Sequence, residues 1–164
     1  MTADQARAVA ETMGRQIQQE WMTTVKVIEA IPEERKDWKP APDSRSAWEL
    51  AVHICRSDVW FLNGILTGDF SRGPQEPPAP TVRELADWYK HEMPMLLERV
   101  LALPPSALAT VVDFYGMKLP NAHFLVWQAT HNAHHRGQLS VYLRPMGARV
   151  PSIYGGSFDE PWKG

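Results

Sequence analysis

The sequence predicts an all-α protein, a four-helix bundle with long connecting loops, on three observations. Apolar residues recur at steps of three and four through four long segments, the spacing that marks one face of an α-helix. Two of these segments open with a helix-capping motif, and prolines interrupt the connections between them. Histidines stand in the second and fourth segments, and bundles of this kind build metal sites from facing helices.

The composition is that of one ordinary globular domain. The chain has 164 residues, of which 44% are hydrophobic and 22% are charged, and its net charge is −2. Scattered basic residues argue against a nucleic-acid partner, and no apolar run approaches the ~20 residues that cross a membrane. A single cysteine excludes an internal disulfide, and the N-terminus lacks the pattern of a secretory signal. We therefore expect a cytoplasmic protein.

The first half of the chain contains two of the expected helices. The first covers residues 3–31, where one apolar stripe continues until Pro32 ends it. After a proline-rich connection, Ser46 and Glu49 match a capping box, in which each side chain satisfies a free backbone N–H. This motif predicts a second helix over residues 46–66.

The second half contains the other two helices. Thr81-Val-Arg-Glu84 is a second capping box and predicts a helix over residues 81–102. Short apolar runs on either side of Gly116 predict a β-hairpin. Pro120 suits the first position of a fourth helix, expected over residues 120–144, and an extended tail is expected over 145–164.

Two histidines in the fourth helix have the spacing of metal ligands. His131 and His135 are four residues apart, so they lie on one helix face about 6 Å apart along the axis. Two imidazoles at this spacing can bind one ion, whereas His134 lies about 100° away around the helix. The alternative is a pair of histidines that only form hydrogen bonds. Asn132 occupies the position of the catalytic Glu of zincin proteases, which makes that class improbable.

His53, in the middle of the second helix, is the candidate for a third ligand. Alone it would be interpreted as a hydrogen-bonded core residue, but a third histidine from a facing helix completes a typical catalytic metal centre with open positions. Ser57 lies one turn after His53 and is a candidate for the pocket or for supporting a ligand. Glu49, one turn before it, is a candidate fourth ligand or base, although its capping role explains it without any function.

The expected roles of three further residues in these helices follow from their positions. Gln138 either lines the cavity or forms a hydrogen bond across the bundle. Gly137 destabilises a helix interior by about 1 kcal/mol relative to alanine, and we expect a close helix contact to be the reason. Cys55 is about 200° away from His53 around the helix, so we expect it to be a buried small hydrophobic residue.

The sequence resembles one known family in these same motifs. The run from His131 to Leu139 (His-Asn-Ala-His-His-Arg-Gly-Gln-Leu), with Tyr142-Leu143-Arg144, Gly147 and the earlier Ser46-x6-His53, is similar to the signature of the DinB-like (YfiT-like) family. The resemblance covers about residues 38–151. It implies a four-helix bundle, often a homodimer, with a divalent metal held by residues that match His53, His131 and His135. Zinc, nickel, iron and copper all suit such ligands.

The resemblance also implies a range of functions. Characterised relatives include S-transferases and isomerases that use a low-molecular-weight thiol such as bacillithiol, mycothiol or glutathione. One hypothesis is therefore a metal-dependent enzyme, a thiol transferase or hydrolase-like, because a bound divalent ion lowers the pKa of a water or thiol. No residue is an evident dedicated general base. The rival hypotheses are a non-catalytic metal-binding bundle that acts as a structural or dimeric interaction module, and a metal-free binding module.

Overall fold

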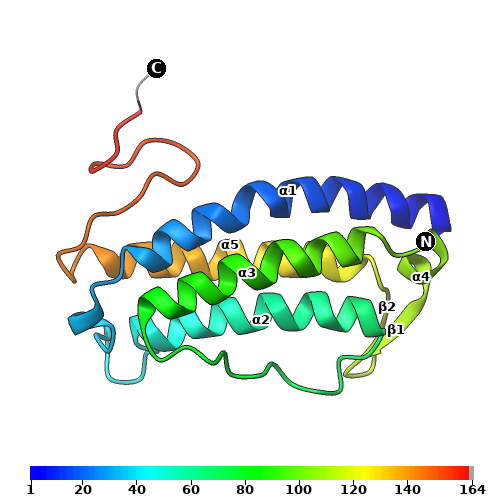
Figure 1. The fold of residues 1–164 in the computed structure, drawn as a ribbon, viewed down its shortest axis with the longest axis horizontal. Coiled ribbons are helices and arrows are strands. Elements are labelled where there is room, and N and C mark those ends of the chain that lie inside the picture. Colours follow the sequence, from blue (N-terminus) through cyan, green and yellow to red (C-terminus); the bar gives the residue numbers. More distant parts are fainter. Residues whose placement is uncertain (163–164) are drawn as a thin grey trace.

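The computed structural model describes residues 1–162, and most of the chain is helical (Figure 1). The long helices are α1 (Ala3–Glu29), α2 (Ala47–Thr67), α3 (Val82–Leu101) and α5 (His123–Leu143). The shorter elements are the 3₁₀ turn η1 (Glu33–Arg35), helix α4 (Pro105–Ala109) and the strands β1 (Val111–Phe114) and β2 (Met117–Pro120). The all-α prediction is confirmed, and the expected hairpin is formed by β1 and β2.

The four long helices form a bundle in which each packs against two others. α2 contacts α3 and α5, and α1 contacts the same two helices, so that α1 and α2 lie on a diagonal. Figure 1 shows the four helices running along the long axis, with the hairpin at one end. Because α2 and α5 are neighbours, the two helices that carry the candidate ligands face each other.

Side-chain caps fix where α2 and α3 begin. Ser46 accepts a hydrogen bond from the Glu49 N–H, and the Glu49 carboxylate accepts one from the Ser46 N–H at 2.7 Å, as the capping box predicts. The second predicted box is only half formed. Thr81 accepts from the Glu84 N–H, but the Glu84 carboxylate accepts from the Thr81 hydroxyl at 2.6 Å instead of from its N–H.

The start of the fourth long helix differs from the prediction. The expected range was 120–144, but α5 begins at His123 because Pro120 is the last residue of β2 and pairs with Val111. The Asn121 side chain then donates a hydrogen bond to the Ile65 carbonyl oxygen at 2.7 Å. This bond ties the start of α5 to the end of α2. The other helix bounds differ from the predicted ones by one or two residues, and the tail has no helix or strand over 145–162.

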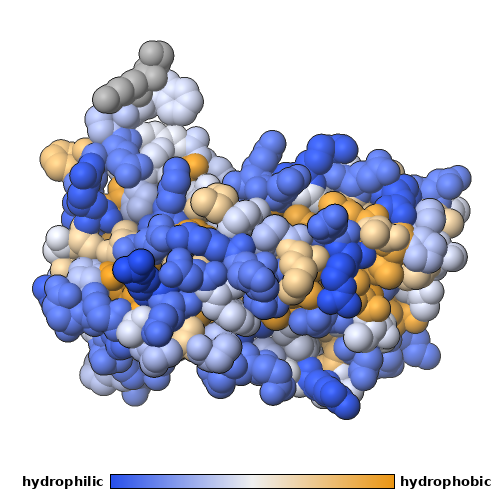
Figure 2. Space-filling view, viewed as in Figure 1, coloured by the Kyte–Doolittle hydropathy of each residue, from blue (hydrophilic) through white to orange (hydrophobic). Residues whose placement is uncertain are grey.

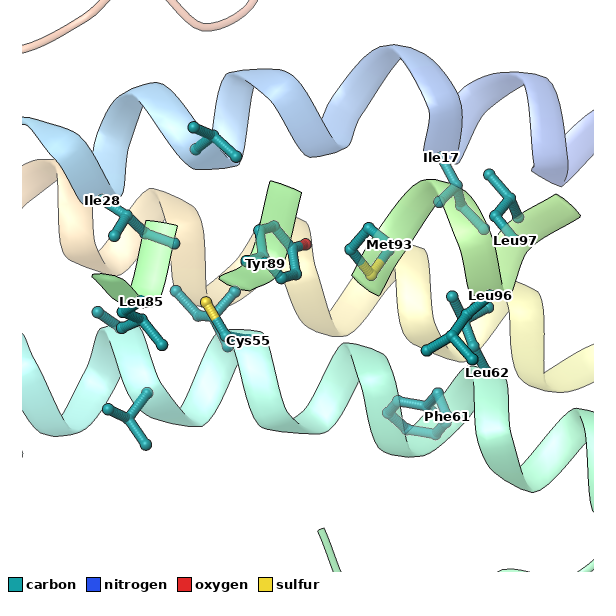
Figure 3. Packing of buried hydrophobic residues seen from close by; sticks show 14 of the residues in the cluster. Ile17, Ile28, Cys55, Phe61, Leu62, Leu85, Tyr89, Met93, Leu96 and Leu97 are labelled. Atoms are coloured by element: carbon teal, nitrogen blue, oxygen red, sulfur yellow. The ribbon is translucent and has the colours of Figure 1, made fainter. Parts of the chain in front are cut away.

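Apolar side chains fill the space between the helices (Figure 3). Ile17 and Ile28 of α1 and Tyr89 and Met93 of α3 point into this space and are almost fully buried. Cys55 is fully buried among them, as expected. Figure 2 shows mostly polar side chains on the outer face, with apolar ones gathered over the N-terminal half of α1 and the C-terminal half of α3. None of the helices within residues 1–162 is long and apolar enough to cross a membrane.

The loop between α2 and α3, residues 68–80, is anchored along the bundle. The ring of Phe70 lies so close to Gly64 that a Cβ at this glycine would come within 2.1 Å of a ring carbon. Trp60 adds a second anchor, because its indole N–H donates to the Arg72 carbonyl oxygen at 2.5 Å. The loop therefore covers one face of α2 and defines the cavities on that face.

The prediction for Gly137 is wrong. A Cβ at Gly137 would have no atom of residues 1–162 within 4 Å, and the residue is exposed. Its face of α5 points to solvent, whereas the faces toward α1 and α2 carry Arg136 and His135. No helix contact therefore requires glycine at this position.

Candidate metal centre

Three imidazoles from two helices converge at one point between α2 and α5. The Nε2 atom of His53 lies 3.0 Å from Nε2 of His131 and 3.2 Å from Nε2 of His135. The ligand atoms of all three side chains lie within 4.8 Å of one another, and each side chain is half-buried. The structure therefore brings together the three residues that the sequence singles out as candidate ligands.

Two of the three spacings between these nitrogens, those that involve His53, match the spacing around one divalent ion, and the ligand atoms of all three side chains lie within 4.8 Å of one another. Two nitrogens that are each about 2.0–2.1 Å from an ion lie roughly 2.9–3.4 Å apart for bond angles between octahedral and tetrahedral values. The two Nε2–Nε2 distances fall inside this range. The group contains no further His, Cys, Asp or Glu within residues 1–162, so three ligands leave at least one coordination position open.

Neighbouring side chains orient two of the imidazoles. Gln138 donates from its amide nitrogen to the Tyr142 hydroxyl at 3.2 Å, which turns its Oε1 toward Nδ1 of His135 at 3.1 Å. The Nδ1–H therefore donates to Gln138, and Nε2 of His135 keeps its lone pair for an ion. The hydroxyl oxygen of Ser57 lies 3.5 Å from Nδ1 of His53. Contacts of this kind fix the orientation of metal-binding histidines.

His131 is held differently from the other two histidines. Its Nδ1 is buried and has no hydrogen-bond partner among residues 1–162. The ring packs instead against Phe61, at 5.9 Å between ring centroids. This imidazole is therefore positioned by packing and by its place on α5, one turn before His135.

The environment keeps all three imidazoles in the neutral form that binds metals. Burial, with added repulsion from the Arg45 charge, lowers the pKa of His53 to about 3. Burial and the neighbouring His135 lower the pKa of His131 to about 4. Burial also lowers the pKa of His135, against the opposing effect of its Gln138 hydrogen bond. At neutral pH an ion would thus bind without displacing protons from these rings.

The other candidates lie outside the three-histidine group. Glu49 makes its capping hydrogen bonds, lies 3.4 Å from the Lys39 ammonium and does not belong to the group of three histidines. His134 is exposed on the adjacent face of α5. Of the other two histidines, His91 is exposed and His123 is half-buried.

A buried polar network behind the histidines is a feature that the sequence analysis missed. Asp58 is fully buried, and its Oδ2 accepts hydrogen bonds from the Tyr89 hydroxyl at 2.5 Å and from the Asn132 amide at 2.6 Å. Asn132 in turn accepts from the Thr24 hydroxyl at 2.7 Å. Since Asn132 directly follows His131, this network joins α1, α2 and α3 to the α5 turn that carries a candidate ligand.

Arg136 extends this polar layer toward α1 and the tail. Its side chain is 1% exposed, and Nη1 lies 2.5 Å from the Glu20 carboxylate. Nη2 donates to the Tyr154 hydroxyl at 2.5 Å. Gln128, Asn132 and Arg136 are all buried and follow one another at steps of four, so they form a polar stripe beside the histidine face. That spacing was the available signal for this network in the sequence.

Replacing Asp58 by asparagine is expected to change how stability depends on pH. Burial raises the pKa of Asp58 from 3.8 to about 6, so the folded state keeps this proton to higher pH than the unfolded chain. Protonation of Asp58 therefore contributes fully to the free energy of unfolding below pH 3.8, and this contribution is lost as the pH rises through 6. The difference between the two pKa values corresponds to roughly 3 kcal/mol. Urea unfolding from pH 4 to 7 should show that the free energy of unfolding of wild type falls relative to that of Asp58→Asn as the pH rises. If the two free energies change with pH in parallel, the prediction is wrong.

Comparison with known proteins places the chain in a family. The family model described as "DinB family" matches residues 4–163. The chain belongs to the DinB family. YjoA, an uncharacterized protein of Bacillus subtilis strain 168, is 31% identical over 126 residues, which are 76% of this chain and 82% of YjoA. A second protein of that strain, YrdA, is 32% identical over 123 residues, covering 71% of this chain and 68% of YrdA.

Solved structures of DinB-like proteins share the fold. The crystal structure of YjoA superposes with a TM-score of 0.74 at 28% identity, over 92% of this chain and 99% of that one. A DinB-like protein from Bacillus cereus gives a TM-score of 0.75 at 27% identity, over 88% and 97% of the two chains. The DinB assignment thus agrees with the four-helix arrangement and with the resemblance seen in the histidine motif.

Proposed function

We propose that this DinB protein is a cytoplasmic metal-dependent enzyme that activates a low-molecular-weight thiol for transfer, or water for hydrolysis. His53, His131 and His135 would hold one divalent ion. The single observation that carries the proposal is the group of three half-buried imidazoles, which are partly open to solvent and have no fourth protein ligand within residues 1–162. An ion held by three neutral imidazoles keeps its full charge and lowers the pKa of a thiol or water in its open position toward 7.

The roles of the chain's own residues follow from their contacts. Gln138 and Ser57 orient the imidazoles of His135 and His53. The buried network around Asp58 holds the α5 turn that carries His131. None of these groups has the position of a general base at the open side of the site. The thiol or water would therefore become reactive because its lowered pKa places more of it in the anionic form at neutral pH.

The proposal predicts a thiol-transfer rate that depends on metal. Bringing a thiol pKa from about 8.5 to 7 raises its thiolate fraction at pH 7 about sixteenfold. We expect the zinc-, nickel- or iron-loaded protein to accelerate transfer of bacillithiol, mycothiol or glutathione to a chromogenic aryl halide by at least about this factor over metal-free protein. The His131→Ala variant should lose the acceleration. A chromogenic ester tests the hydrolytic reaction in the same way.

The second candidate is a non-catalytic bundle whose ion is structural or which serves as a dimeric module. It is favoured by the surface between α1 and α3, where Trp21, Leu97 and Leu101 line a groove of about 410 Å³ that could seat a second copy. Protein that binds one equivalent of metal, forms a dimer and shows no metal-dependent reaction with any thiol or ester would support this candidate against the enzyme.

A further inference from the structure

A cavity lies on the face of α2 that the 68–80 loop covers, along the stretch of the helix that carries His53. Its volume is about 360 Å³, which is the lower end of the range for small-molecule sites. Glu49 and Arg56 line it from α2, one turn before and one turn after His53. The remaining lining residues come from the connection before α2, from α2 and from the loop: Arg45, Trp48, Val52, Glu76, Pro77 and Ala79. The three histidines do not line the cavity themselves, but His53 lies on α2 between two residues that do.

Most charges around this cavity are already paired. Glu49 accepts from the Ser46 N–H and lies 3.4 Å from the Lys39 ammonium. Arg56 forms an ion pair with Glu76 of the covering loop. Arg45 is the exception, because its guanidinium makes no hydrogen bond or ion pair within the part of the chain that the structure describes. An exposed cation with no partner thus stands at the wall of the cavity.

Arg45 shares the wall of this cavity with Glu49 and Arg56, the α2 side chains one turn before and one turn after His53. A divalent ion held by three neutral imidazoles would add two further positive charges on this side of the bundle. A ligand that carries two negative groups, one toward the ion and one toward Arg45, would neutralise these positive charges. The fork of a guanidinium matches a carboxylate in particular.

We propose that Arg45 binds a carboxylate of the substrate, and that the cavity beside His53 selects small thiols with a carboxylate a few bonds from the sulfur. This inference rests on the proposed function, since the thiol end must reach the three histidines. Trp48, Val52 and Pro77 supply apolar walls for the carbon chain between the two ends. Arg45 is thus a specificity-determining residue.

The test compares two thiols of the same shape on cobalt-loaded protein. The probes are 3-mercaptopropionate and its neutral amide, and binding is followed by the thiolate-to-cobalt absorption at pH 7. We expect wild type to bind the carboxylate about tenfold more tightly than the amide, the size of a charge-assisted hydrogen bond. Arg45→Gln should reduce this preference to about twofold or less, and Arg45→Lys should keep part of it.

Matched controls separate the subsite from general charge effects. Arg83, whose side chain is 92% exposed on α3, is the control, and Arg83→Gln should keep the full preference. Cobalt content and helical circular dichroism should be the same in all variants, because Arg45 is exposed. If both thiols bind equally, or if Arg45→Gln keeps the preference, the inference is overturned and the proposed function stands. If neither thiol alters the cobalt spectrum, the proposed thiol chemistry fails, and the inference fails with it.

Discussion

Replacing His53 by alanine is expected to remove the bound metal while leaving the bundle folded. His53 is the candidate ligand that α2 contributes, and its Nε2 lies within 3.2 Å of both other candidate nitrogens, which α5 contributes. Changes to residues that only support a ligand weaken metal binding by about 10–100-fold, so the loss of a ligand should weaken it by at least about 100-fold. Mass spectrometry of tag-free protein should find about one equivalent of a divalent metal in wild type and almost none in the variant.

His134→Ala is the matched control for this prediction. His134 belongs to the same histidine run but is exposed on another face of α5, so its removal should leave metal content unchanged. Metal should also raise thermal stability in wild type and in this control only, by about 4 kcal/mol at a free concentration a thousandfold above the dissociation constant. A His53→Ala protein with wild-type metal content, or a wild type that takes up none, would contradict the three-histidine site.

Among the substitutions proposed, Arg136→Ala is expected to lower the free energy of unfolding most. The guanidinium is 1% exposed and contacts the Glu20 carboxylate and the hydroxyl groups of Thr24 and Tyr154. Removing one partner of a buried ion pair typically destabilises a protein by about 3–5 kcal/mol, because the remaining charge loses its compensation. For a chain of this size, this corresponds to a decrease in Tm of roughly 6–20 °C. Urea unfolding and thermal circular dichroism measure both quantities.

Arg144→Ala is the control for the Arg136 prediction. Arg144 also forms an ion pair near the end of α5, with its Nη2 2.7 Å from the Asp159 carboxylate, but its side chain is 51% exposed. Solvent screens such a pair, and its loss should change stability by less than about 1 kcal/mol. Equal effects of the two substitutions would show that the burial of Arg136 does not determine its contribution.

The bundle could be predicted because the apolar spacing in α1, α2 and α3 is regular and the Ser46–Glu49 box marks a helix start. The start of α5 could not, because Pro120 suits a helix N-terminus and a strand end equally well. Only its pairing with Val111 decides between the two. That contact is between elements, and local preferences do not encode it.

The histidine group could be predicted in part. The spacing of His131 and His135 places them on one face of a helix, His53 is the candidate third ligand from a facing helix, and the family resemblance agrees with all three. The buried network was missed because a lone Asp58 on a helix looks like a solvent-exposed residue until its partners are known. Its partners Tyr89 and Asn132 are 31 and 74 residues away in sequence. Arg45 was missed for a similar reason, since only the folded loop makes it part of a cavity wall.

The hydrogen bonds of the polar layer between α1 and α5 can form only late in synthesis. Arg136 donates to the Glu20 carbonyl oxygen across 116 residues, and Thr24 donates to Asn132 across 108. At translation rates of about 5–20 residues per second, α1 leaves the ribosome on the order of ten seconds before these partners are made. The polar side of α1 that faces α5 therefore remains without its α5 partners through most of translation.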